Sequence, residues 1–107
     1  MNSDFFNLYS HDFIRVAACV PAVRTADPSH NAERTVELLR EASDRRAVLA
    51  VFPELGISAY SCGDLFFQDA LLQSALKGLE TILGASASLD MVIAAGVPLK
   101  IGDGLFN

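Results

Sequence analysis

Six consecutive apolar residues at positions 47–52 are the feature that most constrains the fold of this chain. Such a run, which includes the β-branched Val48 and Val51, is typical of a strand buried on both faces in a parallel sheet. Pro53 follows and cannot donate a ladder hydrogen bond, so we expect the strand to end there. Open α/β sheets bind ligands beyond the carboxyl ends of their strands. Glu54 is therefore predicted to lie at the rim of such a site.

A carboxylate in this place is a candidate general base, because it can accept a proton from a reacting group. The alternative is that Glu54 is a solvated loop carboxylate, as most acidic residues of a surface loop are. The strand and its ending leave both interpretations open.

The rest of the chain alternates strands with helices. Residues 13–20 predict a first strand. Asp27 and Pro28 predict a helix start, with Asp as the N-cap and Pro at the first helical position. The helix that follows has an apolar stripe suited to packing on a sheet, formed by Ala32, Val36, Leu39 and Ala42.

Residues 64–83 predict either one long helix or a short turn followed by a helix. Its expected apolar face consists of Leu65, Leu72, Leu76, Leu79 and Leu83. Residues 91–97 predict a third strand that Pro98 ends. Residues 101–104 have the composition of a tight turn, so residues 105–107 are expected to open a fourth strand in a hairpin.

The predicted class is α/β, with the element order β-α-β-α-β-β. Right-handed crossovers would place both helices on one face of the sheet and leave the other face and an edge uncovered. We therefore expect residues 1–107 to be the N-terminal part of a larger domain, without a complete second domain. A chain with so much open apolar surface is also expected to self-associate.

Charge and hydropathy exclude several functions. The net charge is −5 and the few basic residues are scattered, which argues against nucleic acid or an anionic membrane as the main partner.

No apolar run approaches the roughly 18 residues of a membrane span. Asp4 stands where a signal peptide carries basic residues, and Arg15 interrupts the apolar run that follows, so we predict a cytoplasmic location.

The two cysteines, Cys19 and Cys62, lie 43 positions apart and lack metal-ligand spacing. Neither a disulfide framework nor a metal site is predicted, and both cysteines are interpreted as structural thiols. We expect no cofactor to bind within this chain.

The sequence resembles the nitrilase-type carbon–nitrogen hydrolases. Within them it is most similar to the N-terminal glutaminase domains of bacterial glutamine-dependent NAD synthetases. The likeness spans nearly the whole chain. It is carried by the opening Tyr9-Ser10-His11-Asp12-Phe13-Ile14-Arg15-Val16, by Ala17-Ala18, by Phe52-Pro53-Glu54-Leu55, by Ser58-Ala59-Tyr60, by Asp64-Leu65-Phe66 and by Gly96-Val97-Pro98-Leu99.

The resemblance implies a partial α-β-β-α sandwich and a Glu-Lys-Cys triad that hydrolyses the side-chain amide of glutamine. Glu54 matches the triad glutamate, which acts as general base. Tyr60 matches a tyrosine near the glutamine pocket, the alternative being ordinary aromatic packing. The family's lysine and cysteine occupy places beyond this chain, and neither its two lysines, Lys77 and Lys100, nor its cysteines match them. We therefore expect the chain alone to be inactive.

For the parent protein, the resemblance implies a ligase domain that uses ATP, Mg²⁺ and the released ammonia to amidate nicotinic acid adenine dinucleotide. Two alternatives stay open: a piece of a simple nitrilase-type amidase, and a non-catalytic α/β interaction module. Where the family often has glycine this chain has Ala59, a position for which we expect a positive φ angle. Asn107 matches an asparagine that opens the next strand, and a structural role is expected for it.

Overall fold

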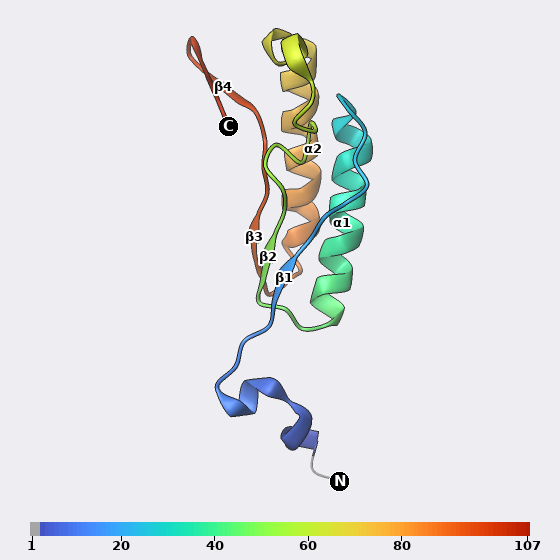
Figure 1. Cartoon of the computed structure of the whole chain (residues 1–107), viewed down its shortest axis with the longest axis vertical. Helices are drawn as coiled ribbons and strands as arrows, with labels where there is room; N and C mark the ends of the chain where they lie inside the picture. Colours follow the sequence, from blue (N-terminus) through green and yellow to red (C-terminus); the bar gives the residue numbers. More distant parts are fainter. Residues whose placement is uncertain (1–2) are drawn as a thin grey trace.

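The computed structural model describes residues 3–107. Three parallel strands, β1 (Val16–Ala18), β2 (Leu49–Val51) and β3 (Val92–Ala94), form a sheet in the order β1-β2-β3. The connecting helices, α1 (Pro28–Asp44) and α2 (Asp69–Ser86), lie side by side against one face of the sheet (Figure 1). The α/β class, the parallel sheet and the placement of both helices on one face are therefore confirmed.

Further short elements complete the described chain. An antiparallel hairpin of β4 (Leu99–Ile101) and β5 (Gly104–Phe106) follows the sheet. Two turns of 3₁₀ helix, η1 (Ser3–Phe6) and η2 (Leu8–His11), precede β1. A third, η3 (Gly63–Phe67), leads into α2. The region 64–83 is thus a turn plus a helix, which is one of the two forms that the sequence allowed.

The element order differs from the expected β-α-β-α-β-β by one strand. Residues 99–101 form a strand of their own, because a hairpin through Gly102 needs a partner on the near side of the turn. The three strands of the main sheet are also shorter than the ranges 13–20, 47–52 and 91–97, with three residues each.

Helix α1 begins as predicted. The side chain of Asp27 accepts a hydrogen bond from the backbone N–H of His30 at 3.2 Å, and Pro28 occupies the first turn, where its missing N–H leaves no helical bond unmade. The expected stripe is buried against the sheet, with exposed fractions between 0% for Leu39 and 8% for Val36.

The apolar face expected for α2 is confirmed in part. Leu72 is buried and Leu79 packs against the core, but Leu76 and Leu83 are 40% and 69% exposed. The helix buries Leu71, Leu72, Ala75, Gly78 and Ile82. A Cβ atom at Gly78 would lie 3.1 Å from a methyl carbon of Ile57 and 3.2 Å from the carbonyl oxygen of Pro28, so the missing side chain lets α2 approach α1 closely and sets which face turns inward.

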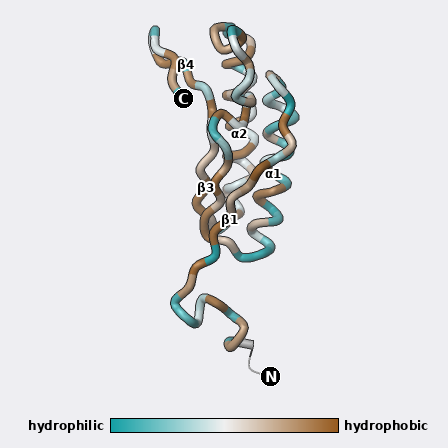
Figure 2. The backbone as a smooth tube through the Cα atoms, viewed as in Figure 1, coloured by the Kyte–Doolittle hydropathy of each residue, from teal (hydrophilic) through white to brown (hydrophobic). Residues whose placement is uncertain are grey.

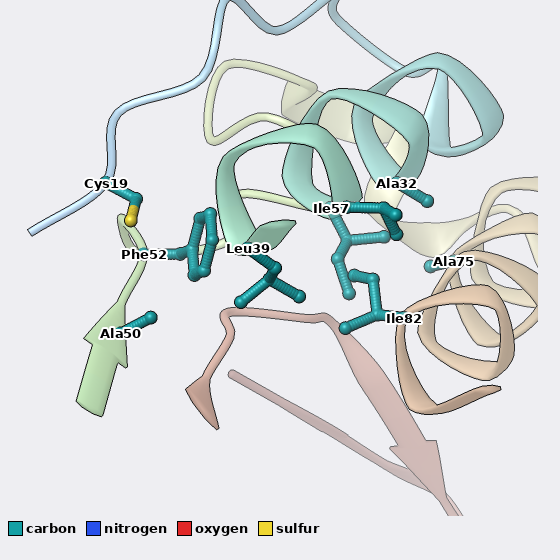
Figure 3. Close-up of a cluster of buried hydrophobic side chains, with 9 residues drawn as sticks. Cys19, Ala32, Leu39, Ala50, Phe52, Ile57, Ala75 and Ile82 are labelled. Carbon is teal, nitrogen blue, oxygen red and sulfur yellow. The ribbon is translucent and has the colours of Figure 1, made fainter. Parts of the chain in front are cut away.

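The two faces of the sheet have different surroundings. The middle residues of the strands, Ala17, Ala50 and Ile93, are paired across the sheet and belong to the core or pack against it. Side chains from β2, from the turn after it and from both helices converge there (Figure 3). On the opposite face Val51 is 44% exposed, so the prediction of a strand buried on both faces is wrong for the described chain.

An N-terminal arm, residues 3–15, extends from the end of the sheet opposite the hairpin (Figure 1). It accounts for the elongated outline of 58 × 23 × 23 Å. The hydroxyl of Tyr9 donates to the carbonyl of Arg46, and the guanidinium of Arg15 donates to the carbonyl of Arg45. Figure 2 shows hydrophobic residues along the strands and in the arm. None of the helices within residues 3–107 is both long and apolar enough to cross a bilayer.

Candidate active site

Glu54 lies just past the carboxyl end of β2, the central strand of the sheet. Phe52 still donates its backbone N–H to the carbonyl of Ala94, at 2.9 Å, and Pro53 then ends the pairing. The side chain of Glu54 is exposed. The carboxylate therefore occupies the edge at which open α/β sheets place their ligands.

The turn after Glu54 is stabilised by short-range hydrogen bonds, and two of its residues have positive φ angles. Gly56 donates to the carbonyl of Pro53 and Ser58 to that of Leu55, both at 3.2 Å. Leu55 and Ala59 have φ angles of 51° and 67°. The expected positive φ at Ala59 is confirmed, and a non-glycine residue in this region costs about 1–2 kcal/mol.

Gly96, just past the end of β3, packs closely against this turn. A Cβ atom at Gly96 would lie 2.3 Å from the backbone nitrogen of Leu55 and 2.7 Å from the carbonyl oxygen of Pro53, distances that only glycine tolerates. The carbonyl of Gly96 also accepts a hydrogen bond from the N–H of Ile57 at 3.0 Å. The backbone at Glu54 is thus clamped against the neighbouring strand.

Asn31 holds the same turn by hydrogen bonds to the backbone, a role that the sequence analysis missed. This residue of α1 is fully buried. Its amide group donates to the carbonyls of Arg24 and Ile57, both at 2.9 Å, and its oxygen accepts from the N–H of Arg24 at 2.7 Å. A polar residue in line with the apolar stripe, four positions before Thr35 and eight before Leu39, is the signal that could have revealed it.

The carboxylate of Glu54 has a partner from the far end of the chain. The side-chain amide of Asn107 donates a hydrogen bond to Oε1 of Glu54 at 2.5 Å, across 53 positions of sequence. Asn107 follows β5 directly, so the hairpin carries it back to the carboxyl end of β2. The sequence likeness matched this residue to a strand start and did not indicate the contact.

Tyr60 lies on the same loop as Glu54 and is 77% exposed. Within the described chain its ring is open to solvent. Its role as a substrate contact stays a prediction.

The two cysteines are buried and separate. The thiol of Cys62 donates to the carbonyls of Ser58 and Ala59, at 3.1 and 3.3 Å, and so ties the loop together. Burial raises the pKa of the Cys19 thiol above its ordinary value of 9.0, with a smaller contribution from the negative charge of Glu41. Both environments fit structural thiols.

The two lysines lie on the hairpin and on α2, and neither contacts Glu54 in the described chain. The ammonium group of Lys100 lies 3.5 Å from the carboxylate of Asp69, an exposed ion pair between the hairpin and α2. Lys77 is exposed on α2. Within residues 3–107, no three histidine, cysteine or acidic side chains are grouped so that they could hold a metal ion.

Residues 15–107 match the carbon-nitrogen hydrolase family. The chain belongs to this family. Among known members, it is 40% identical over 104 residues to a glutamine-dependent NAD(+) synthetase of Mycobacterium leprae, and 31% identical over 72 residues to one of Aquifex aeolicus. The match covers 97% of this chain in the first case and 67% in the second.

Two solved structures of family members have the same fold. A glutamine-dependent NAD(+) synthetase from Cytophaga hutchinsonii superposes with a TM-score of 0.75 and 26% identity over 88% of this chain. One from Acinetobacter baumannii, in complex with adenosine diphosphate, gives 0.66 and 25% over 75%. The matches cover 16% and 15% of those two chains.

The chain is short beside these family members. It spans 15% of the length of the M. leprae relative and 12% of the A. aeolicus relative. The comparisons therefore establish that this chain has the fold of part of a carbon–nitrogen hydrolase.

Proposed function

We propose that this chain is the N-terminal part of the glutaminase domain of a glutamine-dependent NAD synthetase, and that Glu54 is the general base of that domain. The observation that carries the proposal is the position of Glu54: an exposed carboxylate past the central strand, clamped at its backbone by Gly96. The similarity to NAD synthetases over 97% of the chain supports the choice of substrate.

The proposed reaction needs a lysine and a cysteine from the rest of the parent protein. Glu54 takes the proton of the cysteine thiol, and the thiolate attacks the amide carbon of glutamine while the lysine stabilises the oxyanion. The proton passes to the amide nitrogen, which leaves as ammonia. Water then attacks the thioester with Glu54 again as base, which releases glutamate and restores the thiol. Residues 1–107 alone are therefore expected to be inactive.

Tyr60 is proposed to contact the bound glutamine. It lies six residues past Glu54 on the same loop, and its exposed ring leaves the hydroxyl available to a ligand. A contact made equally in the ground and transition states changes KM more than kcat. Tyr60→Phe is expected to raise KM for glutamine and to leave kcat nearly unchanged.

The remaining partners are proposed for the parent outside this chain. ATP, Mg²⁺ and nicotinic acid adenine dinucleotide would bind to a ligase domain that uses the ammonia, and no residue described here is assigned to them. A cytoplasmic location belongs to the same proposal. Residues 1–107 on their own are expected to self-associate through the open sheet face, and a sharp monomer in sedimentation at tens of micromolar would contradict this.

The test is glutamine hydrolysis by the complete parent protein. Glu54→Gln keeps the shape but cannot accept a proton, and is expected to lower kcat by about 10²–10⁴-fold, the contribution of a general base. Glu80→Gln, at an exposed position of α2, is the matched control and should keep full activity. An active Glu54→Gln variant would refute the role of Glu54.

The same assay separates the alternatives. Hydrolysis of simple amides without ATP-dependent amidation of nicotinic acid adenine dinucleotide would indicate a nitrilase-type amidase. A parent inactive on both kinds of substrate would indicate a non-catalytic module.

A further inference from the structure

We infer that Asn107 is a positioning residue, whose side-chain amide holds the carboxylate of Glu54 in one orientation and leaves Oε2 free for the reaction. The inference rests on the proposed function, because it takes Glu54 to be the general base. It replaces the purely structural role that the sequence suggested for Asn107.

The geometry of the hairpin explains how Asn107 reaches Glu54. Leu99 pairs with Phe106 in the β4–β5 ladder, so the next residue, Asn107, comes back to the start of β4. This start lies just past Gly96, the residue that clamps the backbone on both sides of Glu54. One segment, residues 96–107, thus holds the backbone at Glu54 from its first residue and the side chain from its last.

The chemistry of the contact suits a general base. A carboxylate oxygen only accepts hydrogen bonds, so the NH₂ group of Asn107 must face Oε1. The amide donor is neutral and holds the oxygen without competing for the proton that the base takes. Glu54 is exposed, and without this donor its flexible side chain would sample several rotamers.

Holding the base in place matters for the rate. A general base must lie within about 2.6–3.2 Å of the proton that it abstracts. A displacement of about 1 Å can lower the rate of such a step about 10²-fold. The expected effect of losing the Asn107 donor is therefore on kcat and not on the binding of glutamine.

The experiment compares two substitutions in the complete parent protein. Asn107→Leu keeps nearly the size and shape of the side chain but has no hydrogen-bond donor, and Asn107→Ala removes the group. We expect kcat for glutamine hydrolysis to fall about 10- to 10²-fold in both variants, with KM changed less than about twofold. Asp103→Asn, an exposed change in the turn of the same hairpin, is the control.

The Leu variant separates positioning from space filling. If Asn107 only fills space, the Leu variant keeps its activity and the Ala variant is the weaker enzyme, which would overturn the inference. Unchanged kcat in both variants would overturn it too. Should Asn107→Ala fail to fold, as judged by its thermal melt, kcat and KM of the Leu variant decide.

The result is distinguishable from a failure of the proposed function. If the wild-type parent does not hydrolyse glutamine, or if Glu54→Gln remains active, both the function and the inference fall. If the wild type is active and Glu54→Gln is not, unaffected Asn107 variants overturn the inference alone.

Discussion

The two faces of the β1-β2-β3 sheet are built from the same short strands, yet their surroundings differ sharply. On the helix face Ala50 is fully buried, and Leu39 and Ile57 pack in the same core with exposed fractions of 0% and 1%. On the other face Val16 and Val92 are 55% and 67% exposed.

Both faces nevertheless carry apolar side chains. The helix face uses the small Ala17 and Ala50, which let the helices approach, and the open face carries β-branched Val16, Val51 and Val92. Where one face of a sheet is exposed to solvent, the strands normally place polar side chains on that face. The comparison indicates that the open face is composed for burial, in keeping with the two-sheet sandwich that the family likeness implies.

The largest effect on stability is expected from truncating a side chain that is buried between the helices and the sheet. Leu39→Ala should lower the free energy of unfolding by about 2–5 kcal/mol, because it removes a fully buried side chain and leaves a cavity. Urea denaturation followed by circular dichroism measures this. The control Leu83→Ala, at a 69% exposed position of α2, should change stability by less than about 0.5 kcal/mol. Equal losses in both variants would contradict the assignment of the core face.

A smaller effect on stability is expected at Gly96, which packs against the turn that carries Glu54. Gly96→Ala should cost about 1–3 kcal/mol, because the new Cβ would overlap the backbone of Leu55 and Pro53. It should also displace Glu54 and so lower glutaminase activity of the parent. Gly84→Ala is the matched control: it lies in α2 with no atom within 4 Å of a new Cβ, and should stabilise by about 0.5–1 kcal/mol. Gly96→Ala with unchanged stability would show that the turn is not clamped.

On the open face the predicted effect is small in this chain. Val92→Thr should change the free energy of unfolding by less than about 0.5 kcal/mol in the monomer, since the side chain is 67% exposed. The same change should weaken self-association, measured by sedimentation velocity. In the complete parent we expect a clearly larger loss of stability. A loss as small in the parent as in the chain alone would argue that the face stays open.

The smallest effect concerns the pH dependence of the helix face. Burial raises the pKa of Cys19 in the folded state, so the folded chain keeps its thiol proton at a pH where the unfolded chain has lost it. This contribution is complete below the ordinary value of 9.0 and is lost as the pH rises above it. Cys19→Ala should therefore flatten the decline of the urea midpoint as the pH rises above about 9. Parallel curves for both proteins would contradict the assignment.

Features that depend on neighbouring residues were predictable from the sequence. They include the helix start at Asp27 and Pro28, the end of β2 at Pro53 and the position of Glu54 beyond it. The positive φ of Ala59 followed from the family likeness. The buried face of α2 was predictable only in part, because several leucines compete for it and the close contact of Gly78 with Pro28 and Ile57 depends on how the helices pack.

Local preferences of the chain were sufficient for the α/β alternation, for both helices on one face and for a carboxylate past the central strand, because caps, apolar periodicity and proline act over a few residues. The surroundings of that carboxylate were decided only in three dimensions. Gly96 and Asn107 reach Glu54 through the return of the chain at β3 and the hairpin. Contacts across 53 positions depend on the packing of whole elements, which no local pattern records.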